Sequence, residues 1–355
     1  MEYLPSFTQD DEHAFRNSLY GIMEDKGAIV DFIGESWNYA SVLIQIEKEL
    51  KRLAKDQNPT LERYDYLIRN VREITHIQDH FPLSEFSPYI KLYFETFTQQ
   101  PSPVTEPSFL NSLQDNLKAN TFKKEIENKK KRISDNKTSL LKYINTLFEY
   151  RSRLLVIRVD LSYEQDKPKD NHNKFRDGST GFYTQSTGEQ IDLYGGIKNK
   201  NNLMVWGEEV QTQRKQLIKQ LNKKYKNDLV GYVWKLEYGA EKAFHYHMMF
   251  FLDGSKYRQD ITIAQSIGEL WKNEITQGKG IYWNLNAEKK RFEKNDCIAT
   301  GMIKHDDKKL RDNLTKMATY LVKADYFIKT ILSPKSHTYD RGQTPRKNKT
   351  GRPRK

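Results

Sequence analysis

Two histidines in the second half of the chain have the type and spacing for metal chemistry. His245 and His247 lie within residues 244–252, an aromatic and apolar run in which polar rings are uncommon. Side chains two residues apart in a β-strand point to the same face, so both imidazoles should share one face of a sheet. Imidazoles combined with a carboxylate suit Mn²⁺, Mg²⁺ or a similar divalent ion with open coordination positions.

Glu237 is the carboxylate expected beside these imidazoles. Residues 229–238 are rich in Val, Trp, Tyr and Leu, which predicts a strand that forms a hairpin with the histidine-bearing run. A loop over residues 239–243 places Glu237 directly across from His245. A register slip of one residue would offer Glu241 instead. The alternative interpretation is a pair of histidines on a solvated sheet face without an ion.

Tyr320 and Lys323 are a second pair of chemically useful residues. They are three residues apart in a predicted helix, on the flank of an apolar stripe that runs from Leu310 to Ile331 and should dock on the sheet. The tyrosine hydroxyl can serve as a nucleophile beside the cation, and the lysine favours its ionised form. A core-edge tyrosine and a lysine with a packed stem explain the same residues. Tyr326, six residues after Tyr320, points elsewhere and is interpreted as structural.

The elements that must position these groups predict an α+β domain. Hairpin-linked strands with helices between them are typical of a central antiparallel sheet with helices against one face. The expected strands are residues 154–161, 229–238, 244–252, 282–285 and 297–303, and the expected helices are residues 210–225, 263–271 and 310–331.

Four segments follow from the composition along the chain. Residues 1–100 are acidic and predict a helical accessory domain, with apolar residues at helical spacing. Residues 101–135 combine a Pro- and Ser-rich linker with a basic helix, whose charge run is more typical of a solvated face than of a DNA contact. Residues 136–332 form the α+β domain. Residues 333–355 are a basic tail expected to be disordered, ending in GRPRK, half of a minor-groove motif.

The charge of the chain is unevenly distributed. Residues 1–100 carry 10 basic and 17 acidic side chains, whereas residues 101–355 carry 49 and 30. A basic region with abundant aromatic residues is expected to bind nucleic acid, although a basic charge that only maintains solubility is the simpler alternative. The candidate DNA contacts are Arg158, Lys235, Lys316, Arg352 and Arg354.

The sequence predicts a cytoplasmic protein. No apolar run approaches the length of a membrane span, and the N-terminal residues are acidic where a signal peptide would be basic. The single cysteine, Cys297, excludes an internal disulfide and fits a reducing compartment.

The order of these motifs resembles that of the HUH endonucleases, the superfamily of rolling-circle initiators, relaxases and single-strand transposases. Residues 147–329 are most similar to the YagK/YfjJ-type, inovirus-like replication proteins, through LLVIRVDLSY, WKLEYG, HYHMMFFLDG, ELW and YLVKADYF. Neither His-x-His nor Tyr-x-x-Lys alone is specific for this superfamily. The two motifs in this order within a basic α+β domain are a more specific signature.

This resemblance implies a site-specific nickase. Tyr320 would attack a phosphodiester in single-stranded or hairpin origin DNA, forming a covalent 5′-phosphotyrosine linkage and starting rolling-circle replication of a phage, satellite or plasmid-like element. His245, His247 and Glu237 would hold Mn²⁺ or Mg²⁺. The sequence lacks a phosphate-binding loop, so a host helicase and polymerase would be partners. A relaxase, a transposase or a non-catalytic DNA-binding regulator on the same fold are the alternatives.

Overall fold

The structure is a computed structural model with two compact units. It describes residues 35–70, 77–79, 81–99, 106–164, 182–183, 190–191, 200–239, 243–289, 298–333 and 337–345. The helical unit comprises the described parts of Met1–Tyr150 and Lys308–Ile331, and the sheet unit those of Arg151–Asp307 and Leu332–Lys347. The predicted domains divide the chain differently, because they place residues 308–331 with the sheet, and that division stays a prediction.

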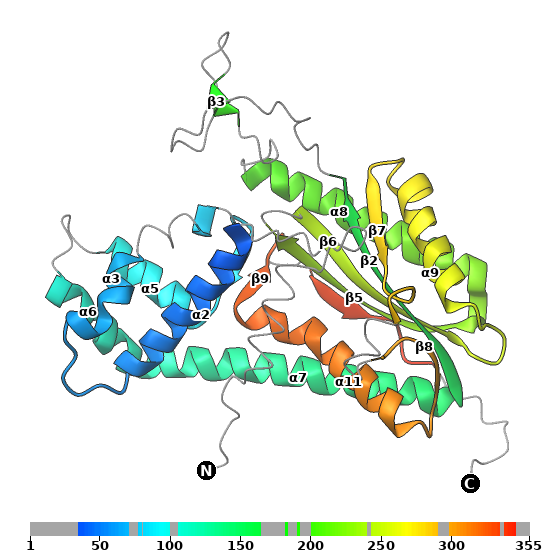
Figure 1. Ribbon diagram of the computed structural model, residues 1–355, viewed down its shortest axis with the longest axis horizontal. Helices are drawn as coiled ribbons and strands as arrows, with labels where there is room; N and C mark the ends of the chain where they lie inside the picture. Colours follow the sequence, from blue (N-terminus) through cyan, green and yellow to red (C-terminus); the bar gives the residue numbers. More distant parts are fainter. Residues whose placement is uncertain are drawn as a thin grey trace. The chain divides into compact units, whose positions relative to one another are not determined.

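The sheet unit is built on a six-stranded antiparallel sheet (Figure 1). The strand order is β10-β5-β6-β2-β7, and β8 pairs with the other end of β2. The predicted α+β class with a central antiparallel sheet is therefore confirmed. The strands are β2 (Arg153–Tyr163), β5 (Leu229–Gly239), β6 (Ala243–Asp253), β7 (Gly280–Asn284), β8 (Gly301–Lys304) and β10 (Tyr339–Arg341); a separate pair consists of β3 (Phe182–Tyr183) and β4 (Gln190–Ile191).

A buried asparagine joins the two short strands along β2. Strand β7 pairs with Val159–Tyr163 and β8 with Arg153–Val156. Between them, the Asn286 side chain donates to the Val156 carbonyl oxygen at 2.9 Å and accepts from the Arg158 backbone N–H at 2.7 Å. The backbone of β2 thus keeps its hydrogen bonds across the gap, which fixes the strand that carries Arg158.

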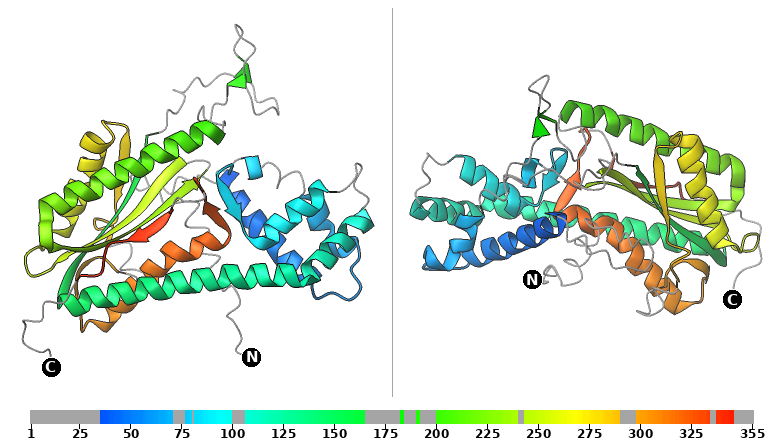
Figure 2. Two further views of the ribbon diagram at one scale, coloured as in Figure 1. Left: turned by 180° about the vertical axis from the view of Figure 1, so that it is seen from behind. Right: turned by 45° about the horizontal axis from the view of Figure 1, so that its top comes forward.

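Helices cover one face of this sheet (Figure 2). Helix α8 (Lys200–Tyr225), α9 (Asp260–Glu269) and the π-helical turn η3 (Leu270–Ile275) lie along it. The Tyr246 ring lies 6.0 Å from that of Trp234 and 6.2 Å from that of Trp271 in η3. Because side chains alternate along a strand, His245 and His247 point to the opposite face.

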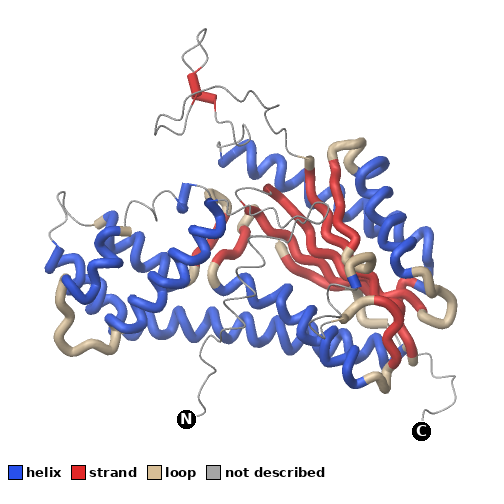
Figure 3. Tube along the Cα trace, viewed as in Figure 1, coloured by secondary structure: helices blue, strands red, loops and turns tan. Residues whose placement is uncertain are grey.

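The helical unit consists mainly of helices (Figure 3), and aliphatic and aromatic side chains form its core. Helix α2 fully buries four of the apolar residues whose three- and four-residue spacing predicted a helix there, namely Leu43, Ile46, Leu50 and Leu53. The elements are α2 (Glu35–Leu53), η1 (Glu62–Tyr64), α3 (Asp65–Arg69), β1 (Ser84–Phe86), α5 (Pro88–Thr98), α6 (Glu106–Lys118), α7 (Asn120–Tyr150), α11 (Lys308–Lys323), η4 (Ala324–Tyr326) and β9 (Ile328–Thr330).

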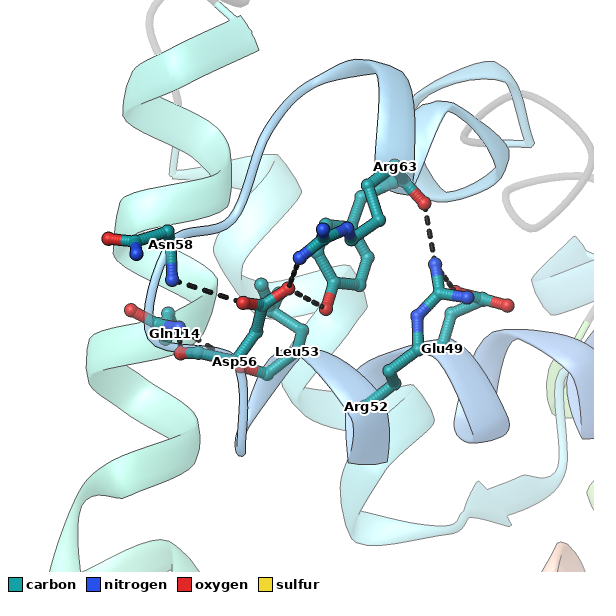
Figure 4. Close-up of polar contacts among 8 residues, drawn as sticks. Glu49, Arg52, Leu53, Asp56, Asn58, Arg63 and Gln114 are labelled. Carbon is teal, nitrogen blue, oxygen red and sulfur yellow. Dashed lines mark hydrogen bonds and ion pairs between the residues drawn. The ribbon is translucent and has the colours of Figure 1, made fainter.

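Polar side chains complete the C-terminal end of α2 (Figure 4). Gln114 donates from Nε2 to the carbonyl oxygens of Leu53 at 3.0 Å and Asp56 at 2.7 Å. The Asp56 carboxylate accepts from Arg63 at 2.8 Å, which with the other donors around it lowers the pKa of Asp56 to about 2. Carbonyl groups that a helix end leaves unpaired thereby gain partners.

The last predicted helix ends earlier than expected. The apolar stripe predicted one helix to Ile331, but α11 stops at Lys323 and residues 328–330 form β9, antiparallel to β1. The β-branched residues of Ile328–Thr330 favour a strand, and Ile328 pairs with Phe86. Helix α11 packs on α7, where the Arg311 guanidinium lies 3.9 Å from the centre of the Phe148 ring.

Part of the basic tail is ordered, which corrects the expectation of disorder for residues 337–345. Strand β10 extends the sheet along β5, pairing Tyr339 with Lys235 and Arg341 with Val233. The Leu236 N–H donates to the Thr338 carbonyl oxygen, so the added strand satisfies backbone groups that an edge strand would expose. Residues 346–355, with Arg352 and Arg354, lie outside the described residues.

No helix within the described residues is both long enough and apolar enough to span a bilayer.

Candidate metal centre

The hairpin of β5 and β6 brings the predicted trio together. Glu237 pairs with His245, in the register that the loop length predicted. Ligand atoms of Glu237, His245 and His247 all lie within 4.8 Å of one another. Glu241 falls outside the described residues, so the alternative carboxylate is not placed.

Both imidazoles turn the same nitrogen toward Glu237. Its Oε2 atom lies 3.2 Å from Nε2 of His247 and 3.4 Å from Nε2 of His245. The other ring nitrogens face acceptors: Nδ1 of His245 lies 3.2 Å from the Ala243 carbonyl oxygen, and Nδ1 of His247 lies 2.9 Å from Oδ2 of Asp160. When Nδ1 carries the proton, as the Ala243 carbonyl favours for His245 and the nearby Asp160 carboxylate favours for His247, the Nε2 lone pair is left to bind a cation.

Asp160 and Arg158 form an outer layer behind His247. Asp160 lies on β2, directly across from His247. Its Oδ1 atom is 3.0 Å from Nε and 2.9 Å from Nη2 of Arg158, while its Oδ2 atom faces the imidazole. A carboxylate behind a ligating histidine fixes the orientation of the ring and increases its basicity. Arg158, predicted as a DNA contact, is 7% exposed and engaged by Asp160.

The backbone at the start of β6 contributes to this arrangement. Ala243 has a φ of 51°, in the left-handed region that residues with a Cβ rarely adopt. The same residue directs its carbonyl oxygen toward Nδ1 of His245. Strained backbone of this kind persists where the surrounding structure holds it, and it often occurs at functional sites.

Burial strengthens the electrostatic coupling among these groups. His245 and His247 are buried, and the Glu237 side chain is 14% exposed. Burial alone would raise the pKa of Glu237, but the imidazoles of His247 and His245 hold it well below its ordinary value. Burial alone would lower the pKa of His247, but the carboxylates of Asp160 and Glu237 raise it to about 9. The two carboxylates thus favour a cation between them.

The donor set fits a divalent metal ion. Two imidazole nitrogens and one carboxylate oxygen converge, which is a mixed nitrogen and oxygen set with coordination positions left for other ligands. The outward partners of both Nδ1 atoms match the second layer found around ligating histidines. The buried group of Glu237, His245 and His247 could therefore bind a metal ion.

The proposed nucleophile lies in the other compact unit. Tyr320 is on α11, with 41% of its surface exposed, and Lys323 is the last residue of the same helix. Because α11 belongs to the helical unit and the trio to the sheet unit, the predicted approach of the phenol to the cation stays a prediction. Tyr326 is buried and donates to Glu47 at 2.8 Å, in agreement with its structural interpretation.

The predicted DNA contacts differ in exposure. Lys316 is exposed on α11. Lys235 is 1% exposed and lies on the face of the trio, paired with His247 across the strands. Their binding to DNA stays a prediction, as does that of Arg158.

Comparison with known proteins places these residues in a family. Residues 115–331, more than half of the chain, match the family model described as the YagK/YfjJ C-terminal domain. The chain belongs to this family. The YagK/YfjJ match contains the whole trio, Asp160, Tyr320 and Lys323. No curated protein and no solved structure matched the chain.

Sequence reasoning about this YagK/YfjJ chain missed Asp160. The predicted strand over residues 154–161 already placed Asp160 and Arg158 on the same face, but not which strand would lie beside them. The structure supplies that neighbour, because β2 pairs with β6. An acidic residue in an otherwise apolar central strand is the signal that could have marked it.

Proposed function

We propose that this chain is a metal-dependent DNA nickase of the HUH type that starts rolling-circle replication of a phage, satellite or plasmid-like element. The observation that carries the proposal is the convergence of two imidazole Nε2 atoms on one carboxylate, with both Nδ1 atoms turned outward. Mn²⁺ or Mg²⁺ is the proposed ion, because both accept nitrogen and oxygen ligands with open positions.

The proposed reaction is a transesterification in single-stranded or hairpin origin DNA. The Tyr320 hydroxyl loses its proton and its oxygen attacks the phosphorus, so a P–O bond to the tyrosine forms. The bond between phosphorus and the 3′ oxygen breaks, and that oxygen takes up a proton. The products are a 5′-phosphotyrosine and a free 3′ hydroxyl, which a host polymerase extends behind a host helicase. The covalent linkage conserves the energy of the phosphodiester, so the strand can be rejoined without ATP.

The chain's own residues are assigned three tasks in this reaction. Lys323 favours the ionised form of the Tyr320 phenol. Asp160 keeps the His247 ring oriented. When bound, the cation supplies positive charge for the non-bridging oxygens of the scissile phosphate. Relaxases and transposases would use the same tyrosine chemistry.

A covalent adduct tests this proposal directly. Labelled single-stranded DNA carrying candidate origin hairpins is incubated with the protein and Mn²⁺, and the products are resolved under denaturing conditions. The native chain should yield a DNA-linked band that Tyr320→Phe lacks. Tyr257→Phe, a change of the same size just after a turn of the sheet unit, should retain it. A band that persists in Tyr320→Phe contradicts the assigned nucleophile, and no band with the native chain on any hairpin contradicts the nickase.

A non-catalytic DNA-binding regulator is the second candidate, favoured by a different observation. His247 lies between two carboxylates, 2.9 Å from Asp160 and 3.2 Å from Glu237, so an imidazolium there could complete a structural ion-pair cluster without a metal. The regulator requires the native chain to bind DNA without forming the adduct, whereas the nickase requires both.

A further inference from the structure

The outer face of α8 carries lysines from a stretch of sequence that contains no acidic residue. Residues 211–226 contain six basic side chains and no acidic one. Lys215, Lys219 and Lys223 recur at intervals of four residues, so they form one row along the helix, and all three are exposed. Within the described part of the chain, no ion pair involves any of the three. We call these residues the α8 lysine row.

Helix α7 shows what a solvated charged face looks like in the same chain. Its residues 120–150 contain eight basic and four acidic side chains, with Glu125, Glu127 and Asp135 among the lysines. On its exposed side, Arg132 lies 3.8 Å from Glu85, and Glu125 lies 3.4 Å from Lys91 of α5. Mixed signs of this kind maintain solubility without selecting a polyanion. The α8 lysine row has a single sign and therefore needs another explanation.

Contacts on the buried side of α8 orient the helix so that the lysine row lies on its exposed side. Leu217 and Leu221 are buried against the sheet unit. Arg214, 6% exposed, stacks its guanidinium 3.6 Å from the centre of the Trp234 ring. At the end of the helix, Lys224 donates to Ser266 of α9 at 2.8 Å. These contacts fix the rotation of α8, and the exposed lysines therefore lie on the side of the helix away from the sheet.

The row and the metal trio belong to opposite faces of one sheet. Helix α8 covers the face of Trp234 and Tyr246, whereas Glu237 and the two histidines point to the other. A nucleotide at the trio is thus separated from the row by the sheet and the helix. Any nucleic acid at the row is a flanking segment rather than the strand that is cut.

We propose that the α8 lysine row binds the phosphate backbone of duplex DNA. The binding of duplex DNA by this row does not depend on the proposed function. The further assignment, that the row holds the duplex beside the nicking site, rests on the proposed function. Lysines four residues apart are about 6 Å apart along a helix, so the row spans about 12 Å. Duplex DNA presents one negative charge per about 1.7 Å of its axis, a dense phosphate array that a row of this length can follow.

The side chains between the lysines fit the same partner. Gln216, Gln220 and Asn222 are exposed beside the row. Amide groups and lysines donate hydrogen bonds to phosphate oxygens and carry no sequence information in doing so. The row is therefore assigned to positioning the duplex, without a preference for its sequence.

The salt dependence of binding tests this inference. Binding is measured in EDTA, without metal, so that no cleavage contributes. The test variant replaces Lys215, Lys219 and Lys223 by Gln, and the control variant replaces Lys124, Lys131 and Lys137 of α7 by Gln, an equal change of charge. The association constant K is measured on a duplex of arbitrary sequence at several salt concentrations. The slope of log K against log salt should become less steep by about 3 in the test variant, since each of three phosphate contacts contributes about 0.9. The control should leave the slope nearly unchanged.

Each result has one interpretation. Circular dichroism and thermal unfolding confirm that both variants are folded, and their Mn²⁺ affinity should equal that of the native chain. If the native chain binds duplex DNA and the α8 variant shows the same salt slope as the native chain, the inference is wrong while the proposed nickase stands. If the α8 substitutions reduce the slope on single-stranded DNA alone, the assignment to duplex is wrong. If the native chain binds no DNA of either form, the inference and the proposed function both fail.

Discussion

Two glutamates, one in each compact unit, have opposite surroundings. Glu47 in the helical unit is 1% exposed and accepts from the Tyr326 hydroxyl at 2.8 Å, the Ser87 hydroxyl at 2.7 Å and the Lys51 ammonium at 2.6 Å. Glu237 in the sheet unit faces two imidazole nitrogens. Hydroxyl and ammonium groups keep their protons at neutral pH, whereas an imidazole can exchange its proton for a metal ion.

This difference separates a structural carboxylate from a candidate ligand. The partners of Glu47 come from α2, from the first residue before α5 and from η4, so the cluster ties distant segments of the helical unit together. The partners of Glu237 come from the adjacent strand, where a hairpin already fixes the backbone. Stability should depend on Glu47 and metal affinity on Glu237.

Loss of a histidine ligand should have the largest effect. His247→Ala removes one of three ligands and should weaken Mn²⁺ binding by more than 100-fold, beyond the roughly 10–100-fold typical of an outer partner. Isothermal titration calorimetry measures the affinity, with His305→Ala as the control because His305 is exposed outside the trio. Equal affinities in the native chain and His247→Ala would refute the site.

Glu47→Gln should show the reverse pattern. Replacing the carboxylate weakens charge-assisted hydrogen bonds from Tyr326 and Ser87 in a buried setting, so unfolding should cost about 3 kcal/mol less free energy. Urea unfolding measures this change, and Mn²⁺ affinity should stay at the native value. Glu237→Gln is the matched substitution, and it should lower Mn²⁺ affinity more than stability. Equal changes in stability and in Mn²⁺ affinity for Glu47→Gln and Glu237→Gln would contradict the division into a structural carboxylate and a metal ligand.

Much of the metal centre could be predicted from the sequence, because it is local. The predicted loop over residues 239–243 sets the hairpin register, and the period of two then places Glu237 beside the histidines. The stripe on α2 was equally accessible, since helical spacing alone specifies a buried face.

The remaining features depend on contacts between residues far apart in the chain. Asp160 precedes His247 by 87 residues, and only the pairing of β2 with β6 brings them together. Arg158 was predicted as a DNA contact from its charge, and that stays a prediction, but the sequence does not show that Asp160 lies beside it. Ile328 looked helical because the spacing of apolar residues does not reveal that β1 offers a strand to pair with.

Substitutions of Asp160 test whether the residue behind His247 contributes to metal binding. Asp160→Val removes the acceptor behind His247 and should weaken Mn²⁺ binding by about 10–100-fold. Asp160→Asn keeps an oxygen that can accept from Nδ1, so its loss should be smaller. Calorimetry supplies the affinities, and NMR of the His247 ring nitrogens reports which of them carries the proton. A native tautomer and native affinity in Asp160→Val would show that Asp160 does not position the ring.

Ala243→Gly should give the smallest effect. Glycine adopts a φ of 51° without steric cost, so the substitution should raise the free energy of unfolding by about 1 kcal/mol. The carbonyl that faces His245 belongs to the backbone and remains, so Mn²⁺ affinity should be retained. Urea unfolding and calorimetry check the two expectations, and a fall in stability would show that the alanine side chain, not the backbone angle, dominates at this position.

The number of Mn²⁺ ions bound per chain tests the central claim most directly. Native mass spectrometry or equilibrium dialysis should find one tightly bound ion in the native chain, and none in a variant that combines His245→Ala with His247→Ala. A native chain that binds no ion, or a double variant that still binds one with native affinity, would contradict the account.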